Sequence, residues 1–171
     1  MNETNKKNTK LKVLRKQSNS NMCIICGINN PNGVKAPFYE MEDGTVVSLF
    51  NFSSTHQSYP ERTHGGLISA MIDEIVGRAI WITEPETWGV TMELKIRYRK
   101  PVPYDKTLKA IGQINKITRR TFEGTGKILD LDGNVLAEGE AIYFKLPLSK
   151  ISSEDTHDDV NIYVPDNIEF L

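Results

Sequence analysis

The clearest hydrophobic pattern in the chain runs from Leu67 to Trp81. Apolar residues recur there at the three- and four-residue spacing of an α-helix: Leu67, Ile68, Met71, Ile72, Ile75, Val76, Ala79 and Ile80. They cover more than one narrow stripe, so this helix is predicted to be buried. Pro85 predicts its end, because proline cannot continue a helix.

Strand-like patterns occupy most of the remaining chain. Residues 34–40 and 45–52 flank the turn Glu42-Asp43-Gly44 and predict a hairpin before the helix. Four further strands are predicted after it, at residues 88–98, 108–117, 122–131 and 135–146. In the first of these, one face is predicted to carry Met92, Leu94, Ile96 and Tyr98, and the other Glu93, Lys95, Arg97 and Arg99. The order predicts an α+β fold, a mostly antiparallel sheet wrapped around one long central helix.

Two acids interrupt the apolar helix. Asp73 and Glu74 stand where burial of a carboxylate is costly without a task. Gly65 and Gly66 open the same helix and allow another group to approach the backbone closely. Free N–H groups and the positive dipole end favour negative charge at a helix start. The combination is typical of acyl chemistry.

Composition excludes several classes of protein. A chain of 171 residues with a net charge of -1 favours one domain, without a global charge argument for nucleic acid or membrane. No apolar run approaches the ~20 residues that span a bilayer, and the N-terminus lacks the apolar core of a signal peptide. Two cysteines do not make a secreted disulfide scaffold. We therefore expect a cytoplasmic protein.

The two ends differ from the middle in charge. Residues 1–21 are polar and basic, and we expect a disordered arm there, without the aromatics that would stack on nucleic acid. Residues 22–148 form the predicted domain. Residues 149–171 form an acidic tail that is either disordered or pinned to the domain or to a partner chain, and its charge would allow it to pair with the basic arm.

Cys23 and Cys26 form a CxxC pair that could be half of a zinc site. No second pair exists, and the nearest histidine is His56. We expect no metal here, and interpret the segment as a tight turn with small, partly buried thiols.

The segment from about residue 22 to 147 resembles the hotdog-fold thioesterases, and most closely the PaaI-like branch of the 4-hydroxybenzoyl-CoA thioesterase superfamily. The resemblance rests on His64-Gly65-Gly66 at the helix start, an acid nine positions after the histidine, and the strand order. Supporting motifs are Cys23-x-x-Cys26-Gly27 with Asn30-Pro31-x-Gly33, His56-Gln57 with Pro60, and Arg97-Tyr98 with Pro101-Val102-Pro103.

The resemblance implies a fold and an assembly. It implies a hotdog fold and a homodimer, possibly paired again into a tetramer, with sites at the interface. Each site would take the helix start from one subunit and the acid from the other. The implied substrate is an acyl-CoA with a small or medium acyl group, and no cofactor is implied.

The resemblance also assigns roles to residues. Asp73 would be the general base or nucleophile, Gly65 and Gly66 the oxyanion hole, and Thr91 a group that orients water. His64 would hold the loop or bind the thioester oxygen, and Gln57 would polarise the carbonyl. Some relatives carry an asparagine where this chain has Ser58, which leaves the role of Gln57 open.

Structural alternatives stay open for these residues. Asp73 could bond across an interface, Glu74 is its adjacent rival, and His64 could simply cap the helix. Arg97, Arg99 and Lys100 could bind the phosphates of coenzyme A or form a charged outer sheet face. The competing function is a non-catalytic acyl-CoA sensor of the same fold.

Overall fold

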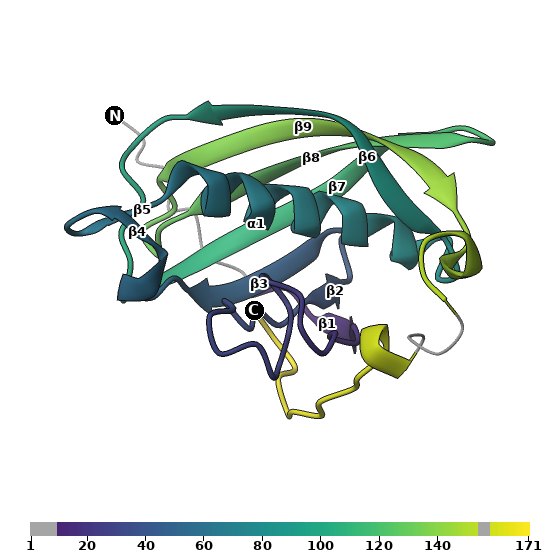
Figure 1. The fold of residues 1–171 in the computed structure, drawn as a ribbon, viewed down its shortest axis with the longest axis horizontal. Helices are drawn as coiled ribbons and strands as arrows, with labels where there is room; N and C mark the ends of the chain where they lie inside the picture. Colours follow the sequence, from purple (N-terminus) through teal and green to yellow (C-terminus); the bar gives the residue numbers. More distant parts are fainter. Residues whose placement is uncertain (1–9, 154–157) are drawn as a thin grey trace, which may run out of the picture.

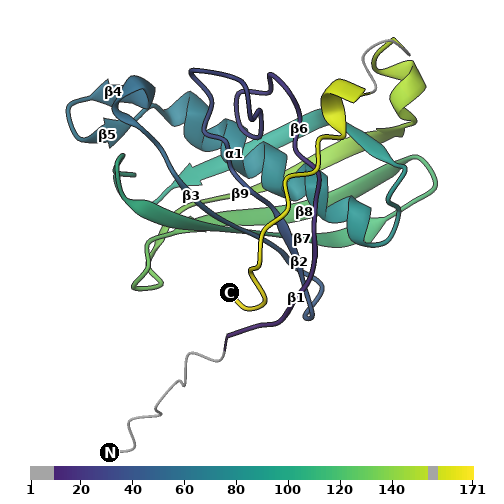
Figure 2. The ribbon, with the colours of Figure 1, turned by 90° about the horizontal axis from the view of Figure 1, so that it is seen from below.

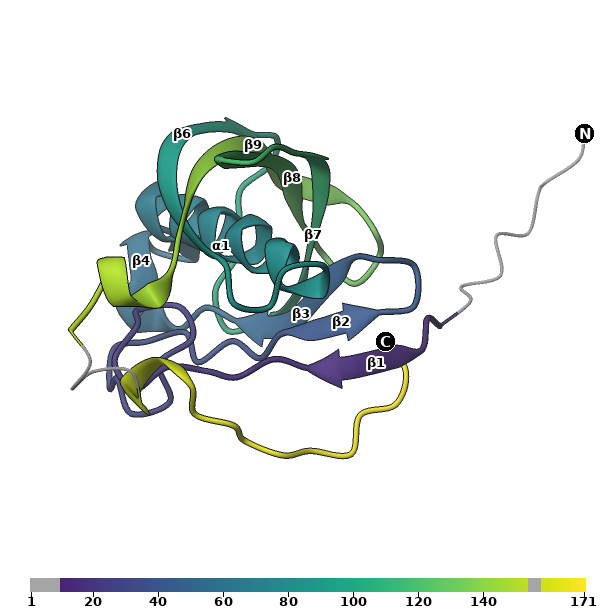
Figure 3. The same cartoon turned by 90° about the vertical axis from the view of Figure 1, so that its right-hand side faces the viewer.

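A seven-stranded antiparallel sheet curls around one long helix in the computed structural model, which describes residues 10–153 and 158–171 (Figures 1 and 3). The helix is α1 (Gly65–Arg78). The strand order is β1-β2-β3-β7-β8-β9-β6. Their bounds are β1 (Val13–Lys16), β2 (Tyr39–Met41), β3 (Val46–Asn51), β6 (Trp88–Tyr98), β7 (Thr107–Ile117), β8 (Thr121–Leu129) and β9 (Val135–Leu146).

The predicted α+β architecture is confirmed. The described residues add a short hairpin between β3 and α1, made of β4 (Gln57–Tyr59) and β5 (Arg62–Thr63), and an extra edge strand, β1. Three short 3-10 helices lie at Ser54–His56, Ala79–Ile82 and Leu148–Lys150. The helical pattern that runs to Trp81 is therefore split, with an α-helix to Arg78 and a tighter turn after it.

The core lies between α1 and the concave face of the sheet. Met71, Ile72, Ile75 and Val76 are all fully buried, and burying each such side chain stabilises the fold by roughly 1.5–3 kcal/mol. The strands carry glycine where the helix presses closest. A Cβ at Gly112 would lie 2.4 Å from the Ile75 carbonyl oxygen.

The first predicted strand is shorter than its pattern suggests. Only residues 39–41 pair as β2, whereas the N–H groups of Val34 and Ala36 donate to the carbonyls of Ile24 and Ile25. Lys35 has a φ of 57°, which an extended strand cannot contain. Residues 34–36, which the pattern assigned to the sheet, therefore bond to the backbone of the CxxC turn instead.

The expectation of a disordered arm over residues 1–21 is wrong for residues 10–21, and residues 1–9 lie outside the described part. Val13–Lys16 pairs with β2 at the sheet edge. Gln17 and Asn19 are buried, with exposed fractions of 4% and 3%. Asn19 Nδ2 donates to the carbonyls of Cys26 and Ala36 at 2.7 and 3.1 Å. Specific side-chain bonds hold this segment, and composition alone does not reveal them.

The C-terminal segment is docked over residues 158–171. It runs beside the N-terminal segment (Figure 2). The Leu11 and Leu171 backbones exchange hydrogen bonds of 2.9 and 3.0 Å. Lys16 forms an ion pair with Asp166 at 2.7 Å. Opposite charges therefore do meet between the two ends, and both belong to one domain with the sheet.

Strand β6 lies at the far edge of the sheet. It pairs only with β9 among the described residues, so its other edge carries unpaired backbone groups. Apolar side chains also face solvent along it: Val90, Met92 and Tyr98 are 42%, 62% and 52% exposed. A long open edge with apolar side chains is typical of a surface that pairs with another chain.

Candidate active site

Asp73 lies at the middle of α1, and its carboxylate is held by two hydroxyl groups. Thr91 Oγ1 donates to Oδ1 at 3.0 Å and to Oδ2 at 3.2 Å. The Tyr143 hydroxyl donates to Oδ1 at 2.9 Å and also lies 2.8 Å from the Asp73 carbonyl oxygen. Two neighbouring strands, β6 and β9, thus position one acid, since Thr91 and Tyr143 are paired across them. The carboxylate keeps lone pairs for a water molecule.

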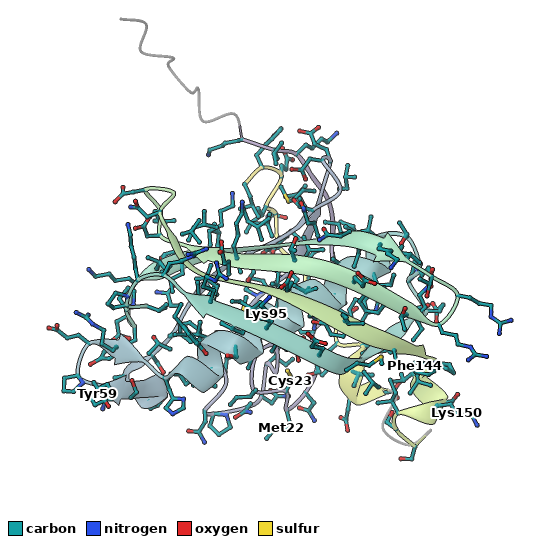
Figure 4. All side chains as sticks on the ribbon, turned by 90° about the horizontal axis from the view of Figure 1, so that it is seen from above. Met22, Cys23, Tyr59, Lys95, Phe144 and Lys150 are labelled. Atoms are coloured by element: carbon teal, nitrogen blue, oxygen red, sulfur yellow. The ribbon has the colours of Figure 1, made fainter. Side chains whose placement is uncertain are left out.

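A β-bulge brings Thr91 to this face. Simple alternation places Thr91 with Glu93 and Lys95 on the outer face, away from the helix. In the structure Thr91 pairs with Tyr143 and Glu93 pairs with Ile142, so Met92 is an extra residue. The bulge reverses the alternation, and Thr91 and Leu94 both face the helix side. After the bulge, Lys95 and Arg97 line a hollow on the outer face of the sheet, as predicted, and Figure 4 shows Lys95 on that face.

Burial raises the pKa of Asp73 above its ordinary value. The hydrogen bonds from Tyr143 and Thr91 oppose the rise, because they stabilise the charged form, and the charge of Glu74 adds to it. Burial and the Asp73 charge raise the pKa of Tyr143 as well, so this phenol stays a donor. The site therefore holds a carboxylate that is a stronger base than an exposed aspartate.

Tyr143→Phe should move the acidic limb of a pH–rate profile to higher pH. The variant removes a donor that lowers the pKa of Asp73, while the aromatic stack on Phe122, with ring centroids 4.7 Å apart, is kept. A base must be ionised, so the rate falls as the pH drops through the Asp73 pKa. In the variant this fall begins at a higher pH. The measurement is kcat/KM against pH for both proteins, and an unmoved limb would contradict the role of Tyr143.

A second cluster of polar atoms lies at the start of α1, apart from the cluster around Asp73. His64 caps the helix, since its Nδ1 accepts the Gly66 N–H at 3.0 Å. The Gly66 N–H is therefore engaged, whereas the Gly65 N–H has no partner in the described residues. With Nδ1 as the acceptor, a neutral His64 carries its proton on Nε2, where it can donate. The capping alternative for His64 is observed, and it leaves this second donor available.

Tyr98 and Ser69 brace the other side of the same turn. The Tyr98 hydroxyl donates to the Gly65 carbonyl at 2.9 Å, and Ser69 Oγ donates to it at 3.0 Å. The two hydroxyls lie 2.7 Å apart. These contacts fix the peptide that follows Gly65 and hold its position against β6.

Gln57 lies beside this turn. It pairs with Thr63 in the β4–β5 hairpin, and the His64 N–H donates to the His56 carbonyl at 2.8 Å. The side chain of Gln57 is exposed. The structure thus brings Gln57, His64, Gly65 and Gly66 together at the start of α1, apart from the group formed by Asp73, Thr91 and Tyr143. We call these groups the oxyanion half and the base half after the roles that the resemblance implies, and those roles stay predictions.

The two halves do not meet within one chain. Gly65 and Asp73 stand eight positions apart in one helix, which is about 12 Å along the axis. A water activated by Asp73 therefore cannot reach a carbonyl held at Gly65 of the same chain.

Glu74 bonds to a different set of groups from Asp73. Its Oε1 accepts from Arg78 Nε at 2.7 Å, and Arg78 also donates to the Ser18 carbonyl at 2.9 Å. Glu74 thus forms an ion pair, whereas Asp73 forms none among the described residues. The structure therefore favours Asp73 over Glu74 as the carboxylate that is available to act as a base. Glu74 Oε2 lies 3.7 Å from Cys23 Sγ, and the ligand atoms of Cys23, Cys26 and Glu74 are all within 4.8 Å of one another.

Arg97, Arg99 and Lys100 are exposed at the end of β6 and just after it. Arg99 forms an ion pair with Glu138, and Lys100 Nζ donates to Asn134 Oδ1 at 3.2 Å. Arg97 lines a hollow of about 780 Å³ on the outer face of the sheet. Phosphate binding by these three residues stays a prediction.

A hollow of about 220 Å³ adjoins Asp73. Its wall includes Trp81, Trp88 and Cys23, and the two indole rings meet edge to face with centroids 4.8 Å apart. Phe52 is fully buried in the core. A larger hollow of about 930 Å³ lies beyond the two tryptophans, between β1 and the C-terminal segment.

Sequence reasoning missed Tyr143, Tyr98 and Ser69. A tyrosine in an apolar strand such as β9 was a usable signal, because a buried phenol needs a partner. Nothing in the local pattern connects either tyrosine to a particular residue of α1.

A family model decides the classification. The model described as "Thioesterase superfamily" matches residues 62–137, from β5 to β9, a segment that contains α1, Asp73 and Thr91. Residues 62–137 thus match the thioesterase superfamily. The resemblance found in the motifs around His64 is thereby confirmed at the level of the superfamily.

Curated relatives of this chain include the mouse acyl-coenzyme A thioesterase THEM4. The two are 31% identical over 116 residues, which cover 67% of this chain and 49% of that protein. The chain thus spans about half the length of this relative.

Solved structures share the hotdog fold. The thioesterase superfamily protein RHA08564 aligns with a TM-score of 0.66 and 24% identity, over 71% of this chain and 62% of that one. The BH2602 protein from Bacillus halodurans, solved with CoA, aligns with a TM-score of 0.57 and 25% identity, over 64% and 72%. The PaaI protein of E. coli aligns with a TM-score of 0.59 and 16% identity, over 66% and 80%.

Within the described part of the chain, no helix has the length and hydropathy needed to cross a bilayer. The compartment stays a prediction.

Proposed function

We propose that this protein is an acyl-CoA thioesterase whose active site is completed across a homodimer. The observation that carries the proposal is the pair of incomplete halves on one helix, with the base half at Asp73 and the oxyanion half at Gly65. The superfamily match over residues 62–137 and the CoA-bound Bacillus halodurans structure support the substrate class.

Strand β6 supplies a physical reason for the dimer. Thr91, near its start, contacts Asp73, and Tyr98, at its end, contacts Gly65. If two β6 edges pair antiparallel about a two-fold axis near Leu94 and Lys95, Thr91 of one chain lies opposite the partner's Tyr98. That pairing joins the base half of each chain to the oxyanion half of the other. Tetramer formation stays a prediction.

The chemistry follows from the two halves. Asp73 takes a proton from water as the water attacks the thioester carbonyl, or attacks the carbonyl itself. The Gly65 N–H, together with the positive end of α1, stabilises the oxyanion as its charge develops. When water attacks, the tetrahedral intermediate collapses to the free acid and CoA, whose thiolate takes up the proton. When Asp73 attacks, the intermediate collapses to a mixed anhydride on Asp73 and the CoA thiolate, and water then hydrolyses the anhydride to the free acid.

The hollow beside Asp73 favours a small or medium acyl group. Its volume is about 220 Å³, and two indole rings form part of its wall. Aliphatic and aromatic acyl groups of this size both fit such an apolar wall. A panel of acyl-CoA substrates, followed by detection of free thiol, measures the activity and ranks the acyl groups. Binding of an acyl-CoA without hydrolysis would favour the sensor alternative.

Mixed dimers test the composite site. Asp73→Asn damages the base half, and Gly65→Pro removes the N–H of the oxyanion half. A mixed dimer of the two variants contains one doubly damaged site and one intact site, because each site draws its halves from different chains. Co-expression with two affinity tags isolates this species, and its activity should be about half of the wild-type value.

Two outcomes separate the parts of the proposal. If the wild-type protein hydrolyses acyl-CoA but the mixed dimer is as inactive as the Asp73→Asn and Gly65→Pro homodimers, the site lies within one chain. The composite geometry is then wrong. If the wild-type protein hydrolyses no acyl-CoA, the thioesterase function itself is overturned.

A further inference from the structure

Cys23 and Cys26 lie in one tight turn next to α1 (Figure 4). The Gly27 N–H donates to the Cys23 carbonyl at 2.9 Å and closes the turn. The N–H groups of Ile25 and Cys26 both donate to Cys23 Sγ at 3.3 Å. The two sulfurs lie within 4.8 Å of each other, so a bond between them requires side-chain rotation within one turn, without movement of separate elements.

The two thiols occupy unlike environments. Cys26 is 2% exposed, and its Sγ lies 3.3 Å from Ser20 Oγ. Cys23 is partly exposed, and both cysteines line the hollow that contains Asp73. Its two N–H donors favour a thiolate at Cys23, because hydrogen bonds to the charged form stabilise it. One thiol is thus accessible and activated, and the other is shielded directly behind it.

We propose that Cys23 and Cys26 form a redox-active dithiol that low-molecular-weight disulfides oxidise reversibly, with Cys23 as the attacking thiol and Cys26 as the resolving thiol. The proposal concerns a site on the wall of the Asp73 hollow and does not depend on thioesterase activity.

The pKa values of the two thiols agree with these roles. The hydrogen bond between the two thiols lowers the pKa of Cys23 to about 7, against the opposing effect of burial. The same hydrogen bond, with burial, raises the pKa of Cys26. A thiol with a pKa near ambient pH is the best attacking group in exchange with a disulfide.

The exchange balances in two steps. The Cys23 thiolate attacks one sulfur of a disulfide RSSR, forms a mixed disulfide and releases RS⁻, which takes up a proton. The Cys26 thiol then loses its proton and attacks Cys23 Sγ, which forms the intramolecular disulfide and releases the second RSH. The protein loses two electrons and two protons, and RSSR gains them.

A zinc site is the competing use of these sulfurs. Cys23, Cys26 and Glu74 would supply three ligands. However, the buried guanidinium of Arg78 already forms an ion pair with Glu74 and lies close enough to Cys26 to favour its thiolate. The positive charge of Arg78 therefore already balances the negative charges of Glu74 and of a Cys26 thiolate, as a metal ion would. This favours a dithiol over a zinc site.

The test equilibrates the full-length protein without oxygen at pH 7 in glutathione buffers of varied ratio. Thiol exchange is then quenched with acid, the remaining thiols are alkylated, and the mass of the protein is measured by mass spectrometry. We expect a Cys23–Cys26 disulfide, detected as the loss of two hydrogens and protection from alkylation, and fully reversed by a dithiol reductant. Its midpoint should lie within the range of ratios that glutathione buffers reach, with a tenfold change in the equilibrium for each ~30 mV.

Two matched variants test the order of attack. Cys26→Ser should retain one glutathione on Cys23, whereas Cys23→Ser should stay unmodified, because Cys26 is shielded. Initial alkylation rates of the wild-type protein supply the same comparison without a substitution, and Cys23 should react first. A protein that stays reduced at every ratio, the opposite asymmetry, or stoichiometric zinc in the purified protein would each overturn the proposal.

Discussion

Asp73→Asn should lower kcat for every accepted acyl-CoA by about 10²–10⁴-fold, the usual contribution of a general base. Asparagine keeps the shape of the side chain, and its oxygen can still accept from Thr91 or Tyr143, whose hydroxyls bond the acid in the wild type. The fold should therefore persist while the ability to take a proton is lost. Free-thiol release over the acyl-CoA panel gives the rates, and size-exclusion chromatography compares the assembly.

The matched control is Asp132→Asn, in the exposed turn between β8 and β9. It makes the same chemical change far from α1 in the sequence, and its rates should equal those of the wild type. If Asp73→Asn keeps wild-type rates, Asp73 is neither base nor nucleophile, and its bonds with Thr91 and Tyr143 are structural.

Gly65→Pro should lower kcat by about 10²–10³-fold, the usual cost of one lost oxyanion donor. Gly65 is the first residue of α1, where proline is well tolerated because the N–H there has no partner inside the helix. His64 has φ -64° and ψ 132°, which is the conformation that a residue before proline prefers. The variant therefore deletes one N–H and keeps the helix.

Gly65→Ala separates the lost donor from added bulk. It keeps the N–H and adds the same Cβ, which would lie 3.3 Å from the Tyr98 hydroxyl oxygen. We expect its kcat to lie much closer to the wild-type value than that of Gly65→Pro. Equal losses in both variants would mean that crowding against Tyr98, and not the N–H, explains the effect.

The position of the acid in the candidate site could be predicted because it violates a local rule. Asp73 stands in an apolar helix, and the cost of burying a carboxylate is visible in the sequence alone. The bounds of two strands were equally accessible, since the patterns along residues 88–98 and 135–146 mark both strands to their observed ends. Local periodicity carries this information because it records which side of each segment is buried.

The partners of that acid could not be predicted in the same way. Simple alternation assigns Thr91 to the wrong face, because the bulge at Met92 depends on how β6 registers against β9. Tyr143 stands 70 positions after Asp73 in the chain, and only the packed sheet brings its hydroxyl to the carboxylate. Contacts of this kind depend on register between distant segments, which no local pattern specifies.

The sequence by itself determined the α+β class, the buried central helix, the glycine pair at its start and the acid within it. Tertiary structure decided which groups hold that acid, and it joined both ends of the chain to the domain through bonds such as Lys16 to Asp166. It also set the register of β6 against β9, and the bulge at Met92 in that register turns Thr91 toward the helix. The apolar pattern marks a helix and its buried face because these are local properties, whereas the bonds from Thr91 and Tyr143 to Asp73 join segments that lie far apart in the sequence, and only the packed fold brings them together.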